Sequence, residues 1–281
     1  MSSIDSIYVV GCGGIGGALI NMLPQTLASL ALDEAHKAMP SYASQAMTNP
    51  VDFPVDPLLS RLVLIDGDSF DAHNGLRQAG TIGSKLVTQM ANIWKQEAWS
   101  VWNHKVSLVG FNNYINPNNI NTILKSENKS KTSVIFMCVD NHKTRYEIAR
   151  YAELLDNVLL INGGNSKTAG NVILYERRKN EELDPPIYEV YPEIAAGTDL
   201  RPDEVACTQV APENDQVCIV NTMIAAIMLA RFSYWVRTGG LEEKSPRKDK
   251  EGNNIMIRRN EVVVDLERCT MMPLTRLKKG N

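Results

Sequence analysis

The sequence predicts an α/β protein built on a doubly wound, Rossmann-like and mostly parallel sheet. Short continuous apolar runs, typical of strands covered on both faces, alternate with segments whose apolar residues recur at helical spacing. Polar pairs follow the ends of several of these runs, which is where doubly wound sheets bind their ligands. The 281 residues, of which 44% are hydrophobic and 22% charged, are enough to bury one sizeable core.

The predicted strands are β-branched or aliphatic runs, and the predicted helices carry their apolar residues on one face. In chain order we expect a strand at 6–10, a helix at 15–30, a strand at 62–65, a helix at 85–94, a strand at 134–139, a helix at 145–155 and a strand at 158–161. A strongly apolar helix at 216–234, a charged, solvated turn at 242–251 and a final strand at 261–266 complete the chain.

These elements predict a core over residues 1–175, interrupted by an insertion at about 31–60. The insertion contains four prolines and is too long for an ordinary connection between a helix and a strand. Residues 176–216 are expected to form a mobile, irregular loop, because ten acidic residues and one basic residue lie with several prolines between Glu181 and Asp215. Residues 217–281 then add the C-terminal helix and strand to the same domain.

The composition argues against several classes of protein. A net charge of -3 provides no basic face for nucleic acid. The five cysteines are odd in number and contain no C-x-x-C pair, so we expect no disulfide framework, no structural zinc and a reducing compartment. The N-terminus lacks the pattern of a signal peptide, and the longest apolar run is too short to span a bilayer. We therefore expect a cytoplasmic protein.

A glycine-rich turn follows the first predicted strand. Gly11, Gly13 and Gly16 match G-x-G-x-x-G, with Gly14 inside the motif. Glycine lets the backbone approach a phosphate closely, and the helix that follows offers free N–H groups and the positive end of its dipole. By itself the motif most often indicates NAD(P) or FAD, and a tight turn without a ligand is the plainer interpretation.

Two acidic residues, Asp66 and Asp68, follow the second predicted strand. An acid at this position commonly accepts hydrogen bonds from ribose hydroxyls. Asp66 lies 50 residues beyond Gly16 in the numbering, whereas a dinucleotide site expects roughly 20. The insertion can account for that spacing, and D-G-D is also a good turn sequence without any ligand.

Two cations and a further acid discriminate better between nucleotides. Arg77 and Lys85 can neutralise the charge of a triphosphate, which a dinucleotide needs less. Asp140 ends a strand and is a hard oxygen ligand suited to Mg²⁺. The structural alternatives are a solvated Lys85, a surface ion pair for Arg77 and an N-cap role for Asp140 ahead of the helix that contains Arg145. Together these residues predict a site for ATP and its metal.

At this point the sequence resembles the ThiF/MoeB family, the adenylating core of ubiquitin-activating enzymes, and more narrowly the small ThiF proteins of bacterial accessory or defence-type operons. Tyr191-Pro192-Glu193, Cys207 and Val220-Asn221 match features of that branch. The main motifs that carry the resemblance are Gly11-Cys12-Gly13-Gly14-Ile15-Gly16, Asp66-Gly67-Asp68, Asn74-Gly75-Leu76-Arg77-Gln78, Lys85 and Asp140-Asn141-His142-Lys143-Thr144-Arg145.

The resemblance implies ATP-dependent adenylation of the C-terminal glycine of a ubiquitin-like protein by a homodimer. Residues 1–175 would form the adenylation core. Arg77, Lys85 and Asp140 would be catalytic, with Asp140 also the magnesium ligand. The nucleotide would contact Gly11, Gly13, Gly14, Gly16, Asp66, Asp68, Asn74, Gln78 and Asn141.

The acidic loop contains Cys207, at a place where related activating enzymes carry a thioester-forming cysteine. The acidic neighbours Asp203 and Glu204 disfavour a thiolate, so an ordinary loop cysteine is the alternative. Two other functions stay open from the residues alone. One is an NAD(P)-dependent oxidoreductase, against which Arg77 and Lys85 argue. The other is a non-catalytic scaffold, which would be expected to lack Lys85 or Asp140.

Overall fold

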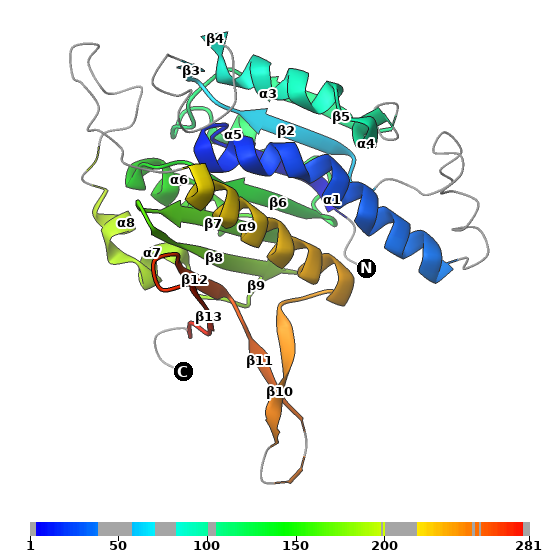
Figure 1. Cartoon of the computed structure of the whole chain (residues 1–281), viewed down its shortest axis with the longest axis vertical. Helices are drawn as coiled ribbons and strands as arrows, with labels where there is room; N and C mark the ends of the chain where they lie inside the picture. Colours follow the sequence, from blue (N-terminus) through cyan, green and yellow to red (C-terminus); the bar gives the residue numbers. More distant parts are fainter. Residues whose placement is uncertain are drawn as a thin grey trace.

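The architecture of the protein is given by a computed structural model. It describes residues 4–38, 58–70, 83–100, 105–197, 199, 218–248, 251–252 and 254–277. Within these residues a large mixed sheet is covered by helices on both faces, and a two-stranded hairpin projects from one end (Figure 1). The predicted α/β, Rossmann-like class is confirmed.

The central sheet has a parallel half and an antiparallel half. In spatial order the parallel half consists of β5 (Ser107–Phe111), β2 (Arg61–Ile65), β1 (Ile4–Val10), β6 (Thr132–Met137) and β7 (Val158–Asn165). The antiparallel half continues with β8 (Ala169–Arg178), β12 (Glu261–Asp265) and β13 (Thr270–Leu274), while the short β9 (Glu181–Glu182) also pairs with β8. Two short strands, β3 (Ser69–Phe70) and β4 (Gly83–Ser84), pair separately.

Alternate residues of the strands belong to two cores. Ile7 and Val9 of β1 pack into the core beneath α1 (Gly14–Ala38), α3 (Lys85–Trp94) and α9 (Cys218–Thr238). Tyr8 and Val10 pack into the opposite core, beneath α5 (Ile120–Ile123), α6 (His142–Ala152), α7 (Ile187–Val190) and α8 (Pro192–Ala196). A short helix, α4 (Glu97–Ser100), buries Trp99 in the first core. This two-sided burial explains why the central strands are continuous apolar runs.

The expectation that no apolar stretch is long enough to span a bilayer is wrong by length and composition, because two helices reach that length and hydropathy. They are the stretch Gly14–Glu34 of α1 and the whole of α9. In the structure these helices pack against each other (Figure 1), and Leu23 and Phe232 are fully buried. We assign them as core helices, because a helix that is mostly buried in the core of a protein has the same length and apolar composition.

Residues 181–197 differ from the irregular, exposed loop expected from their prolines and acids. They form β9, α7 and α8, and Ile187 and Ile194 are buried. The prolines initiate structure here, since Pro186 is the N-cap residue of α7 and Pro192 opens α8, positions that do not need the missing N–H. The rest of the expected loop, residue 198 and residues 200–217, lies outside the described residues.

The C-terminal part also contains more strand than expected. The predicted solvated turn at 242–251 is partly a strand, because β10 (Glu242–Lys248) pairs with β11 (Asn254–Arg258) in the projecting hairpin. The predicted last strand is β12, but β13 follows it at the sheet edge. Helix α1 likewise continues to Ala38, into the expected insertion, of which residues 39–57 lie outside the described part.

A buried ion cluster attaches the hairpin base to the sheet. The guanidinium of Arg258 donates to both oxygens of Asp184 at 2.7 Å, to Glu176 at 2.5 Å and to Glu242 at 2.6 Å. The side chains of Glu176 and Asp184 are 2% and 0% exposed. Burial raises the pKa of Asp184, although the hydrogen bonds and charge of Arg258 oppose that rise. Arg258 therefore keeps two buried carboxylates compatible with folding.

We predict that Arg258→Met lowers the free energy of unfolding by about 3–5 kcal/mol, because it leaves the buried Asp184 without its cation and Glu176 with Arg178 alone. Unpaired carboxylates have a higher pKa folded than unfolded, so stability falls as the pH rises through that interval. The deficit in urea denaturation should thus be smaller at pH 5 than at pH 8. Arg268→Met, at a side chain 81% exposed, is the matched control and should change little. A deficit independent of pH would contradict this explanation.

Candidate functional site

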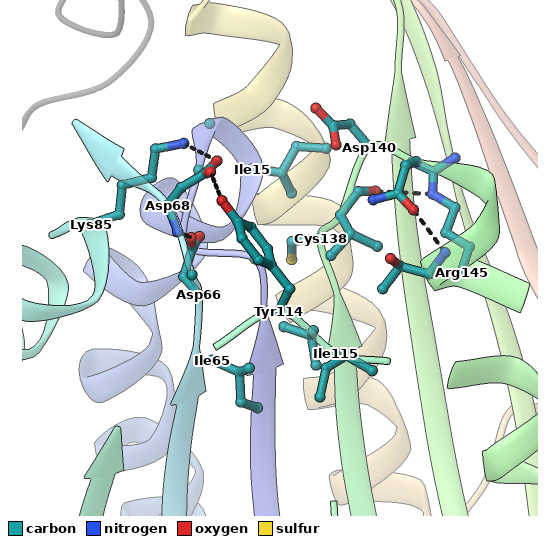
Figure 2. Close-up of a pocket in the computed structure, with 18 of the residues that line it drawn as sticks. Ile15, Ile65, Asp66, Asp68, Lys85, Tyr114, Ile115, Cys138, Asp140 and Arg145 are labelled. Atoms are coloured by element: carbon teal, nitrogen blue, oxygen red, sulfur yellow. Dashed lines mark hydrogen bonds and ion pairs between the residues drawn. The ribbon is translucent and has the colours of Figure 1, made fainter. Parts of the chain in front are cut away.

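A cleft lies at the carboxyl ends of the parallel strands, as expected for a doubly wound sheet. Its empty volume is about 760 Å³, including the part open to solvent. The walls are formed by residues at the ends of β1, β2, β5, β6 and β7 together with the first turns of α1, α3 and α6 (Figure 2).

Most of the described residues predicted for the site line this cleft. They are Gly11, Gly13, Gly14, Asp66, Asp68, Lys85, Asp140 and Asn141. Gly16 is buried beside the cleft and packs on Gly11. Asn74, Arg77, Gln78 and Cys207 lie outside the described residues, so their predicted roles stay predictions. The single cleft nevertheless brings together residues that are more than 100 positions apart in the chain.

The glycine turn is shaped by close contacts between backbones. Gly11 has a φ of 88°, and a Cβ there would lie 2.9 Å from the carbonyl oxygen of Cys138 at the end of β6. A Cβ on Gly16 would overlap the carbonyl oxygen of Gly11. Gly13 has no described atom within 4 Å of its Cβ position, so it faces open space. The turn therefore presents bare backbone and the N-terminus of α1 to the cleft, as phosphate binding requires.

Asp66 braces the turn from the end of β2. One carboxylate oxygen accepts the N–H of Cys12 at 2.5 Å, and the other accepts the N–H of Asp68 at 2.7 Å. Burial raises the pKa of Asp66, while these two N–H groups oppose the rise. A carboxylate has about four acceptor positions, so Asp66 can hold the turn and still accept from a ligand hydroxyl.

Asp68, Lys85 and Tyr114 form a second group at this end of the cleft (Figure 2). The Lys85 ammonium donates to Asp68 Oδ2 at 2.8 Å, and the Tyr114 hydroxyl donates to Asp68 Oδ1. Burial alone would lower the pKa of Lys85, but the ion pair with Asp68 and the charges of Asp66 and Asp140 raise it overall. Lys85 is therefore cationic at neutral pH and is placed to meet an anionic ligand.

The N-cap of α6 is Asn141 rather than Asp140. The side chain of Asn141 accepts the N–H of Thr144 at 2.7 Å, and Asp199 accepts the N–H of His142 at 2.7 Å and that of Lys143. The start of the helix is thus capped without Asp140, so the alternative N-cap role for Asp140 is wrong. Asp140 instead lines the cleft.

Asp140 is a carboxylate of the cleft that a divalent cation could bind. No group of three or more His, Cys, Asp or Glu side chains among the described residues is arranged to hold a metal ion. Mg²⁺ does not need such a group, because it usually takes one or two carboxylates together with phosphate oxygens and water. The described donors therefore fit a metal that arrives with a nucleotide.

The sequence interpretation missed several residues of the cleft. Tyr114 and Ile115 follow β5, Asn165 ends β7, and Arg145 was noted as part of a motif without a role of its own. The signal for Tyr114 was present: the short run 107–111 is followed by Asn112 and Asn113, the same pattern of apolar strand and polar pair found elsewhere. The run contains a serine and a glycine, and its outer edge has no strand partner among the described residues.

The sequence also matches the model of a known protein family. Residues 59–236 match the model of the ThiF family. The match covers more than half of the chain, so the chain belongs to the ThiF family, and the resemblance to ThiF/MoeB proteins is confirmed. None of the curated protein sequences matches the chain.

Solved structures of similar fold include MccB of Escherichia coli with ATP, at 12% identity and a TM-score of 0.58, with 99% of this chain and 65% of that chain covered. Another is PaaA, at 12% identity and a TM-score of 0.54, with 98% of this chain and 64% of that chain covered. A third is MccB of E. coli with AMPCPP and MccA, at 13% identity and a TM-score of 0.55, with 98% of this chain and 65% of that chain covered. Such identities show similarity of fold alone. The chain covers less than two thirds of the length of each of these three proteins.

Two substitutions within the glycine turn test its geometry. We predict that Gly16→Ala lowers the free energy of unfolding by about 1–3 kcal/mol, because the new methyl group overlaps a backbone oxygen that cannot rotate away. Gly13→Ala places its methyl group in open space and should change stability by less than about 0.5 kcal/mol. Urea denaturation of both variants measures the difference. Equal stability of the two would mean that the turn is not packed in this way.

Proposed function

We propose that this protein is an ATP-dependent adenylyltransferase that activates the C-terminal carboxylate of a small ubiquitin-like protein and uses Mg²⁺. The observation that carries the proposal is the placement of Lys85 and Asp140 in one cleft, together with the glycine turn and the two acids after β2. Membership of the ThiF family supports the same function. A dinucleotide site would explain the turn and Asp66 but leaves Lys85 and Asp140 without a purpose.

Different residues of the cleft would contact different parts of ATP. Asp66 is positioned to accept from the ribose hydroxyls, and Ile65 and Ile115 offer an apolar wall for the base. The glycine turn and the N-terminus of α1 face the phosphates, while Lys85 neutralises part of their charge. Asp140 would hold the Mg²⁺, which supplies further neutralisation of the phosphate oxygens. From the family resemblance, Arg77, Asn74 and Gln78 add to this grip.

The proposed reaction needs no protein base. A carboxylate oxygen of the co-substrate attacks the α-phosphorus of ATP and forms the new P–O bond. The bond from that phosphorus to the bridging oxygen breaks, its electron pair leaves with pyrophosphate, and an acyl-adenylate remains. No proton is transferred in this step, so catalysis consists of positioning the two reactants and stabilising the developing charge.

The co-substrate is proposed to be a protein or peptide end. Solved structures of similar fold include MccB with ATP and the microcin C7 biosynthetic enzyme MccB in complex with N-formylated MccA, which supports an adenylating site that receives a second chain. The ubiquitin-like class comes from the motif resemblance. Transfer of the acyl group to Cys207, assembly as a homodimer and a cytoplasmic location stay predictions.

The central test is ATP–pyrophosphate exchange, which reports reversible adenylation. We predict Mg²⁺-dependent exchange that requires a cognate ubiquitin-like protein ending in glycine. Asp140→Ala and Arg77→Ala should each lower the rate by about 100-fold or more, because each removes charge stabilisation from the phosphates. Asp156→Ala and Arg268→Ala are matched controls, since Asp156 lines a separate surface pocket and Arg268 is exposed on the turn between β12 and β13. Unchanged exchange in both site variants would refute the site.

A further inference from the structure

One end of the cleft has no role in the ATP binding proposed above. The strand order β5–β2–β1–β6–β7 arranges the cleft residues in a line. Asp66 and Asp68 stand at the end of β2, the glycine turn follows β1, and Asp140 follows β6. Beyond Asp140, at the end of β7, the wall is formed by Asn165 and by Arg145 from α6. Figure 2 shows Arg145 on the opposite side of the cleft from Asp68 and Lys85.

The guanidinium of Arg145 is held by backbone groups. Its Nε donates to the carbonyl oxygen of Val139 at 3.0 Å, and Nη2 donates to that of Gly163 at 3.4 Å. A Cβ on Gly164 would lie 3.6 Å from Nη2 and 3.7 Å from Nη1, so the guanidinium lies against the backbone just before Asn165. Arginine has five N–H donors, and these bonds use two of them. Donors therefore remain for an anionic group in the cleft.

Asn165 is oriented by a buried neighbour. Its amide nitrogen donates one N–H to Oδ1 of Asn221 at 2.6 Å, so its side-chain oxygen and its second N–H remain to meet a ligand. Asn221, on α9, is 1% exposed, and its Nδ2 has no hydrogen-bond partner within the described part of the chain. A Cβ on Gly14 would overlap that nitrogen, so Asn221 is wedged between Asn165 and the first turn of α1.

A fixed donor and a fixed acceptor side by side suit the end of a peptide chain. The last residue of a peptide carries an anionic carboxylate and, two bonds from that carboxyl carbon, an N–H donor. We propose that Arg145 and Asn165 form the acyl subsite, in which Arg145 binds the carboxylate to be activated and Asn165 Oδ1 accepts the N–H of that last residue. Asn221 acts as a positioning residue. This proposal rests on the proposed adenylation, and it adds that the co-substrate is recognised through its last peptide group.

The test compares two stable mimics of an acyl-adenylate by calorimetry. One is N-acetylglycyl sulfamoyl-adenosine, and the other is its N-methylglycyl counterpart, which lacks the relevant N–H. AMP reports the nucleotide half alone. The wild-type protein should bind the glycyl mimic about tenfold more tightly than the N-methyl mimic, since one buried hydrogen bond is lost.

The variants assign that preference to residues. Asn165→Ala should abolish the preference and leave the affinity for AMP unchanged, whereas Asn165→Asp should keep it, because a carboxylate also accepts an N–H. Arg145→Gln should weaken both mimics equally, by about tenfold or more, without affecting AMP. Thermal unfolding checks that each variant is folded, and if Arg145→Gln does not fold, the Asn165 pair decides alone.

The outcomes separate the two levels of the proposal. No preference in the wild-type protein, or a preference that survives in Asn165→Ala, overturns the subsite. A parallel loss of AMP affinity in Asn165→Ala or Arg145→Gln would assign that residue to the nucleotide and also overturns it. If the protein binds AMP and ATP but binds the acyl mimics no more tightly than AMP, the acyl subsite is wrong and the proposed adenylation is unaffected. Failure of the wild-type protein to bind AMP or ATP sinks both.

Discussion

The close approach of the glycine turn to the ends of β2 and β6 is the constraint on which the site depends. Gly11 can pass the Cys138 carbonyl only with a positive φ and no side chain, and Gly16 must lie on Gly11 for α1 to begin where it does. Asp66 fixes the turn from the other side through the N–H of Cys12. Because α1 is a core helix, this local packing links the backbone of the glycine turn that faces the cleft to the stability of the whole sheet.

Capping determines which side chains are free to meet a ligand. Asn141 and Asp199 satisfy the first N–H groups of α6, so Asp140 is released to face the cleft. Asp68 accepts hydrogen bonds from Lys85 and Tyr114, and these bonds hold the Lys85 ammonium in place before an anionic ligand binds. The parallel sheet supplies the rest of the arrangement, since its strands all end at one edge and align residues distant in sequence.

The sequence was sufficient for the fold class, and most of the described residues that it predicted for the site line one cleft. Continuous apolar strands and the residues that follow them carry a local signal, which is why Asp66, Lys85 and Asp140 were found. Tyr114 was missed because β5 contains a serine and a glycine and is only partly buried at the sheet edge. Asn165 was missed because its orientation depends on Asn221 of α9. The strands β10 and β13, and the ordered segment 181–197, depend on long-range partners. No local sequence pattern predicts the pairing of Arg258 with Asp184 and Glu176, because these residues are far apart in the chain.

The central claim is that one cleft holds a nucleoside triphosphate and its magnesium between Lys85 and Asp140. A crystal structure of the protein with Mg²⁺ and a non-hydrolysable ATP analogue tests it most directly. The account predicts phosphates over the glycine turn, Lys85 hydrogen-bonded to a phosphate oxygen, and an Asp140 oxygen about 2.0–2.1 Å from the metal. A nucleotide bound elsewhere, or a metal in the cleft that Asp140 does not touch, would contradict it.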